Sequence, residues 1–316
     1  MTPKLPQITT CPYARTLLVN VETSVEHIFP HSIGGSADFA VHASEVANSS
    51  LGTAIDAPFV DSDLVVACRQ RHEIKSRSGI PQLKVRGKVT ETGDEVEYTF
   101  GTEESEQIRF INPVEPIENV FQIRASDSDQ ERLVQAVIDQ NRKKGKSVEA
   151  ISRTRMESPG LHLEVTFDLT DVKLGMLKIA YLCAFRFLGD AWLDDPIAQK
   201  MHQVLVSSEP REAVQGCEIH GQAFNCANVV GPLFPSLSQA EHAVAVCRFN
   251  SGHPFIALGL FGGEFLNIST RLSERSTFGL QETDGFVAIV DAKQRRTEVR
   301  SFMDHANTLC DDGLWT

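Results

Sequence analysis

The sequence predicts an α+β fold, and three observations support this class. Residues 82–125 hold several short β-rich runs separated by turn residues. Residues 172–188 place apolar side chains at helical spacing, and the chain becomes β-rich again after about residue 240. Because the second half has helices before strands rather than alternating with them, it reads as α+β and not α/β.

The individual elements follow from local patterns. Strands are expected at residues 82–90, 95–100, 108–112 and 120–125, a helix within 127–147, a strand at 162–169, a helix at 172–188 that stops at Gly189, and a helix begun by Pro196. Late strands are expected at residues 242–249, 254–262, 264–270, 285–290 and 297–302. The main boundary is placed between residues 157 and 161. The expected segments are 1–62, 63–158 with a β-rich and basic character, and an α+β domain at 159–316.

Composition narrows the class of protein. The chain has 316 residues, 41% hydrophobic and 23% charged, which is ordinary for a globular protein. No apolar run is long enough for a membrane helix, and the N-terminus lacks the apolar stretch of a signal peptide, so no membrane partner is expected. Seven scattered cysteines predict no disulfide framework and favour a reducing, cytoplasmic location.

Charge is distributed unevenly along the chain. The net charge is -12, which by itself disfavours binding of nucleic acid, because phosphates bind best to a positively charged surface. Two basic tracts stand out against this average. The first, residues 69–88, has one acid, Glu73, and contains Arg69, Arg71, Lys75, Arg77, Lys84, Arg86 and Lys88. The second, residues 142–155, has six basic residues and one acid. The residues of both tracts are candidate phosphate contacts. The alternative is that they are only solvent-exposed side chains on loops and on the outer faces of helices and strands.

One stretch, "SVEHIFPHSIGG" at residues 24–35, carries residue types suited to phosphodiester chemistry. Glu26 and His27 are neighbours on a predicted strand, so they share a site only at a strand end or a bulge. The following segment, "SEVANSSLGTAID", predicts a short helix capped by Ser44, bearing Asn48 and ending near Gly52. Carboxylate and amide oxygens are ligands for Mg²⁺, and a histidine held off the metal can take a proton from water.

These segments resemble the HNH endonucleases, whose ββα-metal core carries an "EHxxPxxxGG" run and a closing helix with Asn. The resemblance covers about residues 11–60. It implies Glu26 and Asn48 as ligands of one Mg²⁺ or Mn²⁺ ion, and His27 as the general base. Further candidates for supporting or phosphate-contacting roles are His31, Asp38 and Asp56. The alternative for His31 is an exposed loop histidine, and the alternative for Asp56 is a helix-end aspartate. Asp38 lies near the place of the family's middle Asn, which has no clear counterpart here.

This sequence differs from many members of the resembled family at the positions that bind zinc. Many relatives hold this core with a zinc ion bound by two CxxC pairs, whose places here are Cys11, Ala14, Ser44 and Ala47. One thiolate cannot complete a four-coordinate site, so no structural zinc is expected. A second cluster, Cys217, His220 and Cys226, has the residue types of a zinc site but lacks a fourth ligand.

The functional prediction is a metal-dependent endonuclease that hydrolyses phosphodiester bonds, with DNA favoured over RNA. A bacterial defence or mobile-element setting is suggested by the resemblance. The alternative is a catalytically inactive, HNH-like protein that binds nucleic acid or acts as a scaffold. The C-terminal half is assigned to sensing, targeting or assembly, including contact with a protein partner or a second copy of the chain.

Overall fold

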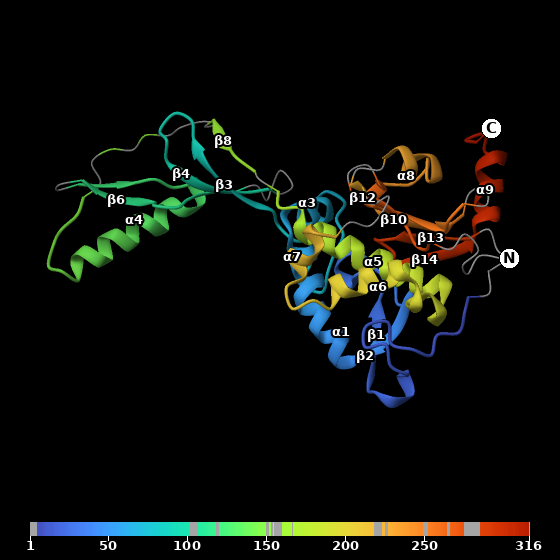
Figure 1. Ribbon diagram of the computed structural model, residues 1–316. Helices are drawn as coiled ribbons and strands as arrows, with labels where there is room; N and C mark the ends of the chain where they lie inside the picture. Colours follow the sequence, from blue (N-terminus) through green and yellow to red (C-terminus); the bar gives the residue numbers. More distant parts are fainter. Residues whose placement is uncertain are drawn as a thin grey trace. The chain divides into compact units, whose positions relative to one another are not determined.

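Two compact units make up the chain in the computed structural model (Figure 1). One combines Met1–Pro81 with Asp168–Thr316, and the other is Gln82–Phe167. The structure describes residues 5–100, 107–117, 120–149, 152, 154, 160–165, 167–217, 223–224, 227–248, 252–263, 266–274 and 285–315. Both helices and sheets are present, so the predicted α+β class is confirmed.

The units group the chain differently from the expected segments 1–62, 63–158 and 159–316. Buried residues of the N-terminal part, such as Phe29 and Phe59, lie in one hydrophobic cluster with Tyr181 and Leu258 from the second half. The N-terminal part therefore shares its core with the C-terminal part. The predicted boundary at 157–161 falls largely on residues outside the described ranges.

A β-hairpin followed directly by a helix forms the N-terminal part of the first unit. Its elements are η1 (Leu18–Asn20), β1 (Thr23–His27), η2 (His31–Ile33), β2 (Ala40–Ser44), α1 (Glu45–Leu51), η3 (Gly52–Asp56), α2 (Ala57–Asp61) and α3 (Asp63–Arg71). β1 and β2 pair antiparallel, with Glu26 opposite Val41 and His27 opposite Ala40. The helix does not end at Gly52 as expected, because the backbone continues through the π-helical turn η3 into α2. A hairpin-then-helix order is thus present.

The two glycines of the opening stretch have a steric explanation. Gly34 has φ +95°, and a Cβ there would lie 2.4 Å from the Cα of Ala292. A Cβ on Gly35 would lie 1.7 Å from the carbonyl oxygen of Phe29. Side chains at these positions would clash with backbone, so the pair lets the loop after β1 return on itself and pack against the turn at Ala292.

The second half of this unit is a large antiparallel sheet between helices. Its strands, in the spatial order β14-β13-β10-β11-β12-β9, are β9 (Ala223–Phe224), β10 (Glu241–Cys247), β11 (Phe255–Leu260), β12 (Leu266–Arg271), β13 (Gly285–Asp291) and β14 (Arg296–Ser301). The other elements are α5 (Thr170–Leu188), η4 (Asp190–Asp194), α6 (Pro196–Leu205), α7 (Pro210–Gln215), α8 (Ala227–Leu233), η5 (Phe261–Gly263) and α9 (Phe302–Asp311). Among the described residues, helices precede most of the strands, as predicted.

Helices cover both faces of this sheet (Figure 1). The alternate residues of β10 belong to two different hydrophobic clusters, one on each face. Val244 and Val246 lie in the cluster that contains α5, whereas Ala243 and Ala245 lie in the cluster with Val230 of α8 and Phe302 of α9. This explains why the late strands read as continuous apolar runs. The short helices α3, α7, α8 and α9 were not predicted.

The second unit, Gln82–Phe167, contains a four-stranded antiparallel sheet, a two-stranded ribbon and one helix. The sheet order is β5-β4-β3-β8, and the elements are β3 (Lys84–Val89), β4 (Glu95–Thr99), β5 (Gln107–Phe110), β6 (Val114–Ile117), β7 (Val120–Ile123), α4 (Asp127–Arg142) and β8 (Leu161–Leu163). Five of the predicted elements are present in shortened form. Strand β6 was not predicted, and in place of the strand expected at 162–169 the structure has the short β8, which ends at Leu163.

A buried histidine joins the hairpin loop to the large sheet. The Nε2 atom of His242 on β10 lies 2.7 Å from the carbonyl oxygen of Ile33, and the Phe261 N–H donates to its Nδ1 atom at 3.0 Å. Both ring nitrogens are therefore satisfied in the neutral form. Burial lowers the pKa of His242 to about 4.

We expect this histidine to make the first unit sensitive to acid. Its folded pKa of about 4 lies below the unfolded value of about 6.5, so the folded state binds fewer protons and stability is lost as the pH falls through this window. The loss is of order 3 kcal/mol between about pH 7 and about pH 4. His242→Gln should flatten this part of the pH dependence in denaturant unfolding. His42→Gln, on the exposed side of β2, should keep the wild-type dependence; an unchanged pH slope in His242→Gln would contradict the assignment.

Candidate functional site

His27 lies at the end of β1 and is held in one tautomer by the loop that follows. Its Nδ1 atom is 3.2 Å from the carbonyl oxygen of Ser36. A carbonyl oxygen can only accept, so Nδ1 carries the proton and Nε2 of the neutral ring keeps a lone pair. The side chain is half-buried. This is the arrangement that a histidine base requires: one nitrogen oriented by the backbone and the other able to take a proton.

Glu26 is in a different environment from His27. It is 4% exposed, and its Oε1 atom lies 2.7 Å from the Nζ atom of Lys178 on α5 and accepts a hydrogen bond from the Tyr13 hydroxyl at 2.6 Å. The same Nζ atom lies 2.6 Å from Oδ2 of Asp56. We call Tyr13, Glu26, Asp56 and Lys178 the buried ion cluster. Because β1 pairs in a regular register, neighbouring side chains face opposite sides of the hairpin, and Glu26 faces the core.

The buried ion cluster has perturbed protonation equilibria. Burial raises the pKa of Tyr13 well above its usual range, and the neighbouring Glu26 carboxylate adds to this. Burial also raises the pKa of Asp56, although Lys178 acts in the opposite direction. Tyr13 therefore stays a neutral donor to Glu26, and Lys178 supplies the positive charge that two carboxylates require.

Asn48 ties α1 to β1. Its Nδ2 atom donates to the Ser24 hydroxyl at 2.9 Å and to the Val25 carbonyl at 3.2 Å. These contacts hold the helix against the hairpin. They do not bring Asn48 to His27 or to Glu26.

The ligand pair Glu26 and Asn48, implied by the resemblance, does not fit a divalent ion in this arrangement. The Glu26 carboxylate already contacts a lysine ammonium, which would repel a second cation at the same oxygen. Nor does any group of three His, Cys, Asp or Glu side chains within the described ranges form a metal cluster. Glu26 contacts Lys178 and Tyr13 on the core side of β1, whereas His27, at the end of β1, contacts the Ser36 carbonyl.

His31 and a distant arginine lie beside His27. The rings of His27 and His31 have centroids 6.0 Å apart. The Nε2 atom of His31 contacts the guanidinium of Arg295, whose Nη2 atom also donates to the Lys75 carbonyl at 2.7 Å. Burial lowers the pKa of His31, and the positive charges of Arg295 and Arg77 act in the same direction. His31 is thus a neutral acceptor beside two cations.

The remaining candidate, Asp38, is exposed in the loop before β2. Its backbone N–H donates to the Ser36 hydroxyl at 3.1 Å, which shapes the loop that holds His27. Asp56, by contrast, belongs to the buried ion cluster. Its role in this structure is to share Lys178 with Glu26 rather than to face His27.

The first basic tract is divided between the two units. Arg69 is 3% exposed and donates to the Val60 carbonyl at 3.3 Å, so it is buried and is not part of an exposed basic surface. The remaining residues are exposed but belong to two units, Arg71, Lys75 and Arg77 to the first and Lys84, Arg86 and Lys88 to the second. On β3 the exposed side chains face acids of β4, including an ion pair of Lys84 with Glu97 at 3.4 Å.

Other candidates lie partly outside the described ranges. In the second tract, Arg142, Lys143, Lys144 and Lys146 are exposed at the end of α4, whereas Arg153 and Arg155 are outside the description. His220 and Cys226 of the candidate zinc cluster are also outside it.

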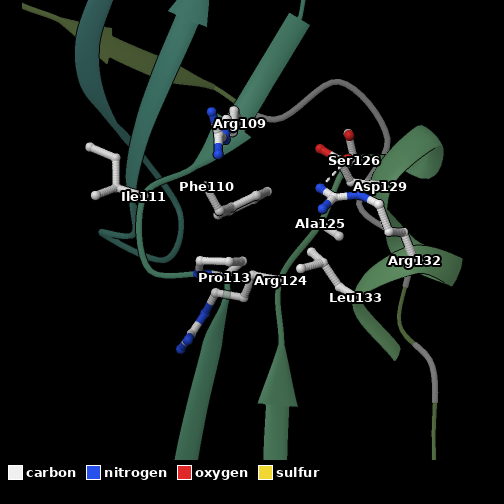
Figure 2. A pocket seen from close by; sticks show the side chains of 10 residues that line it. All are labelled: Arg109, Phe110, Ile111, Pro113, Arg124, Ala125, Ser126, Asp129, Arg132 and Leu133. Carbon is white, nitrogen blue, oxygen red and sulfur yellow. Dashed lines mark hydrogen bonds and ion pairs between the residues drawn. The ribbon is translucent and has the colours of Figure 1, made fainter. Parts of the chain in front are cut away.

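A small pocket in the second unit is lined by three arginines (Figure 2). Arg132 is directed toward Asp129, with Nη2 2.7 Å from Oδ1, and Arg124 pairs with Asp94 and Glu115 at 2.8 Å each. Arg124 and Arg132 are therefore paired with carboxylates of the same unit.

Cys11 occupies the place where relatives of the resembled family bind zinc. Its buried Sγ atom accepts hydrogen bonds from the backbone N–H of Ala14 at 3.3 Å and of Ser44 at 3.1 Å. The predicted positions 11, 14 and 44 are thus close in space. Ser44 lies at the start of α1, but its side chain makes no capping hydrogen bond. Its contribution is the backbone N–H that donates to Cys11.

We expect protein purified without added metal to contain well under one zinc per chain. The reason is that Cys11 supplies one thiolate, whereas a structural zinc site needs four ligands. Elemental analysis of the purified protein measures this directly. A stoichiometric zinc that persists in Cys310→Ser, on exposed α9, and disappears in Cys11→Ser would contradict the prediction.

Three residues of the site were missed in the sequence. Lys178 had a signal: it is a single lysine inside the apolar run "LGMLKIAYLCAF", where an unpaired charge is costly, so a buried partner was to be expected. Tyr13 and Arg295 had no such signal, and the contact of Arg295 with His31 spans 264 residues of the chain.

Comparisons of this chain with protein-family models, curated proteins and solved structures found no match. Within the described part of the chain, no helix is both long enough and apolar enough to cross a bilayer. The functional assignment therefore depends on the side chains around His27.

Proposed function

We propose that this chain is an HNH-type phosphodiester hydrolase acting on nucleic acid, DNA in preference to RNA, with His27 as its general base. The observation that carries the proposal is the contact between Nδ1 of His27 and the Ser36 carbonyl, which leaves Nε2 to accept a proton. The hairpin-then-helix order around it, β1, β2 and α1, has the connectivity of a ββα core.

In this proposal Nε2 of His27 takes a proton from a water molecule, and the water oxygen attacks phosphorus. The bond from phosphorus to the bridging oxygen on the far side breaks, and the departing alcohol takes a proton from solvent. The chain's own contributions are the orientation of His27 by Ser36 and the placement of its ring at a strand end. A divalent ion would supply charge stabilisation of the phosphate when bound, but Glu26 would not hold it, because its carboxylate is paired with Lys178.

A second candidate is a non-cleaving protein that binds nucleic acid or acts as a scaffold. The observation in its favour is the pairing of Glu26 with Lys178, since it removes the carboxylate that the resemblance assigns to a metal. Under this alternative the hairpin and α1 serve only as a structural module. Assembly through the C-terminal half, with a partner protein or a second copy, is compatible with either candidate.

A plasmid-nicking assay separates the two. Purified full-length chain is incubated with supercoiled DNA and Mg²⁺, with Mn²⁺ or with chelator. The hydrolase proposal predicts open-circular product in at least one metal condition and its loss with chelator. Product that survives the chelator would reject the metal dependence alone. Absence of product in every condition, together with retained DNA binding, would favour the non-cleaving candidate.

A further inference from the structure

The turn between β13 and β14 brings a cationic side chain from the far end of the chain to His31, whose ring lies 6.0 Å from that of His27. The carboxylate of Asp291 accepts from the backbone N–H groups of Lys293 and Gln294, both at 2.9 Å, which closes the turn. Ala292 in this turn packs against Gly34 so closely that no Cβ fits there. Arg295 follows with φ +54°, a conformation uncommon for a residue with a side chain. The turn is thus fixed against the loop after β1.

The guanidinium of Arg295 is held by neutral groups. It contacts Nε2 of His31 and the Lys75 carbonyl, and no carboxylate of the described residues forms an ion pair with it. A guanidinium has five N–H donors, and these two contacts engage two of them. Donors therefore remain for a further acceptor, and the positive charge is not neutralised by the surrounding side chains.

Neighbouring charges reinforce this imbalance. Arg77 is exposed and acts electrostatically on His31, and the His31 ring lies 6.0 Å from His27. Lys293, by contrast, pairs with Glu73 at 3.5 Å and is set apart from the group. Arg295 is half-buried, is oriented by two acceptors and has no carboxylate partner among the described residues. Its guanidinium can therefore bind phosphate oxygens through paired hydrogen bonds.

We propose that Arg295, oriented by His31 and Lys75, binds a backbone phosphate of the nucleic acid beside His27. The inference rests on the proposed function, which it deepens by naming the phosphate subsite. Arg295 then contacts substrate, whereas His31 is a positioning residue that acts through Arg295. The chain's C-terminal sheet, through its β13–β14 turn, completes the site on the N-terminal hairpin.

Binding of a labelled DNA duplex, measured by fluorescence anisotropy across several salt concentrations, tests this subsite independently of cleavage. Arg295→Gln should weaken binding at low salt by about tenfold or more, since it removes charge-assisted hydrogen bonds. It should also lower the slope of log affinity against log salt by about one unit, for unrelated sequences alike. Arg295→Lys should keep the salt slope but bind less tightly, because a single ammonium cannot make the paired contact.

Arg296→Gln is the matched control. This neighbouring arginine is exposed at the start of β14, and no hydrogen bond among the described residues joins it to His31 or Lys75, so binding should equal wild type. Equal affinities and slopes for Arg295→Gln and Arg296→Gln, with thermal melts showing both folded, would overturn the proposal. Failure of wild type to bind the duplex at low salt would overturn it too. Loss of binding in Arg295→Gln without any nicking by wild type would support the subsite and reject the hydrolase.

Discussion

Replacement of His27 by alanine should lower the rate of plasmid nicking by about 10²–10⁴-fold, the range expected for loss of a positioned proton acceptor. The affinity for DNA should change little, because the ring is assigned to proton transfer and not to holding the backbone. The measurement is the single-turnover rate at saturating protein, with duplex binding measured on the same preparations.

The control for this experiment is His42→Ala, which removes an exposed histidine from β2 of the same hairpin. It should leave both rate and affinity at wild-type values. An unchanged rate in folded His27→Ala would exclude His27 as the base. If a fall in the affinity of His27→Ala for DNA accounts for the whole loss of rate, the role of His27 is substrate binding and not proton transfer.

Replacement of Lys178 by methionine should destabilise the first unit by about 3–5 kcal/mol. The side chain of Lys178 is 2% exposed, and the change leaves the Glu26 carboxylate buried without its cation. Chemical denaturation of wild type and variant measures the difference in unfolding free energy. The same change on exposed Lys200 of α6 should cost less than about 0.5 kcal/mol.

A double variant separates charge from packing. If the loss in Lys178→Met comes from an unpaired Glu26, then Lys178→Met with Glu26→Gln should recover a large part of it, because a neutral amide is less costly to bury than a charge. Additive losses in the double variant would show that Lys178 and Glu26 are not energetically coupled.

Two buried contacts join the N-terminal core to itself and to the second half. The Cys11 thiol accepts from the backbone of Ser44, and the buried ion cluster links α5 to the hairpin. The cation comes from residue 178, in the part of the chain that supplies the large sheet and its covering helix. The N-terminal core is therefore expected to depend on the second half for stability.

Local pattern alone determined much of the regular structure. The apolar spacing in residues 172–188, with Gly189 after it and Pro196 further on, predicted α5 and the start of α6. The β-rich run at residues 82–90 predicted β3, on which the structure shows Lys84, Arg86 and Lys88 exposed. These features depend on backbone preferences and on the periods of helix and strand, which neighbouring residues carry. The short helices α3 and α7 were missed because fewer than three turns give too little period to detect.

The tertiary structure decided which charged residues are near one another and which are buried. From the sequence, Arg69 was predicted to lie on a basic surface. In the structure the packing of α3 buries it, and its guanidinium donates a hydrogen bond to the Val60 carbonyl. Glu26 read as a metal ligand, but α5 brings Lys178 to it. Arg295 lies 264 residues from His31 in the chain and yet contacts it. Such pairings depend on long-range packing, which places a side chain by the faces of two elements rather than by the residues beside it in the sequence.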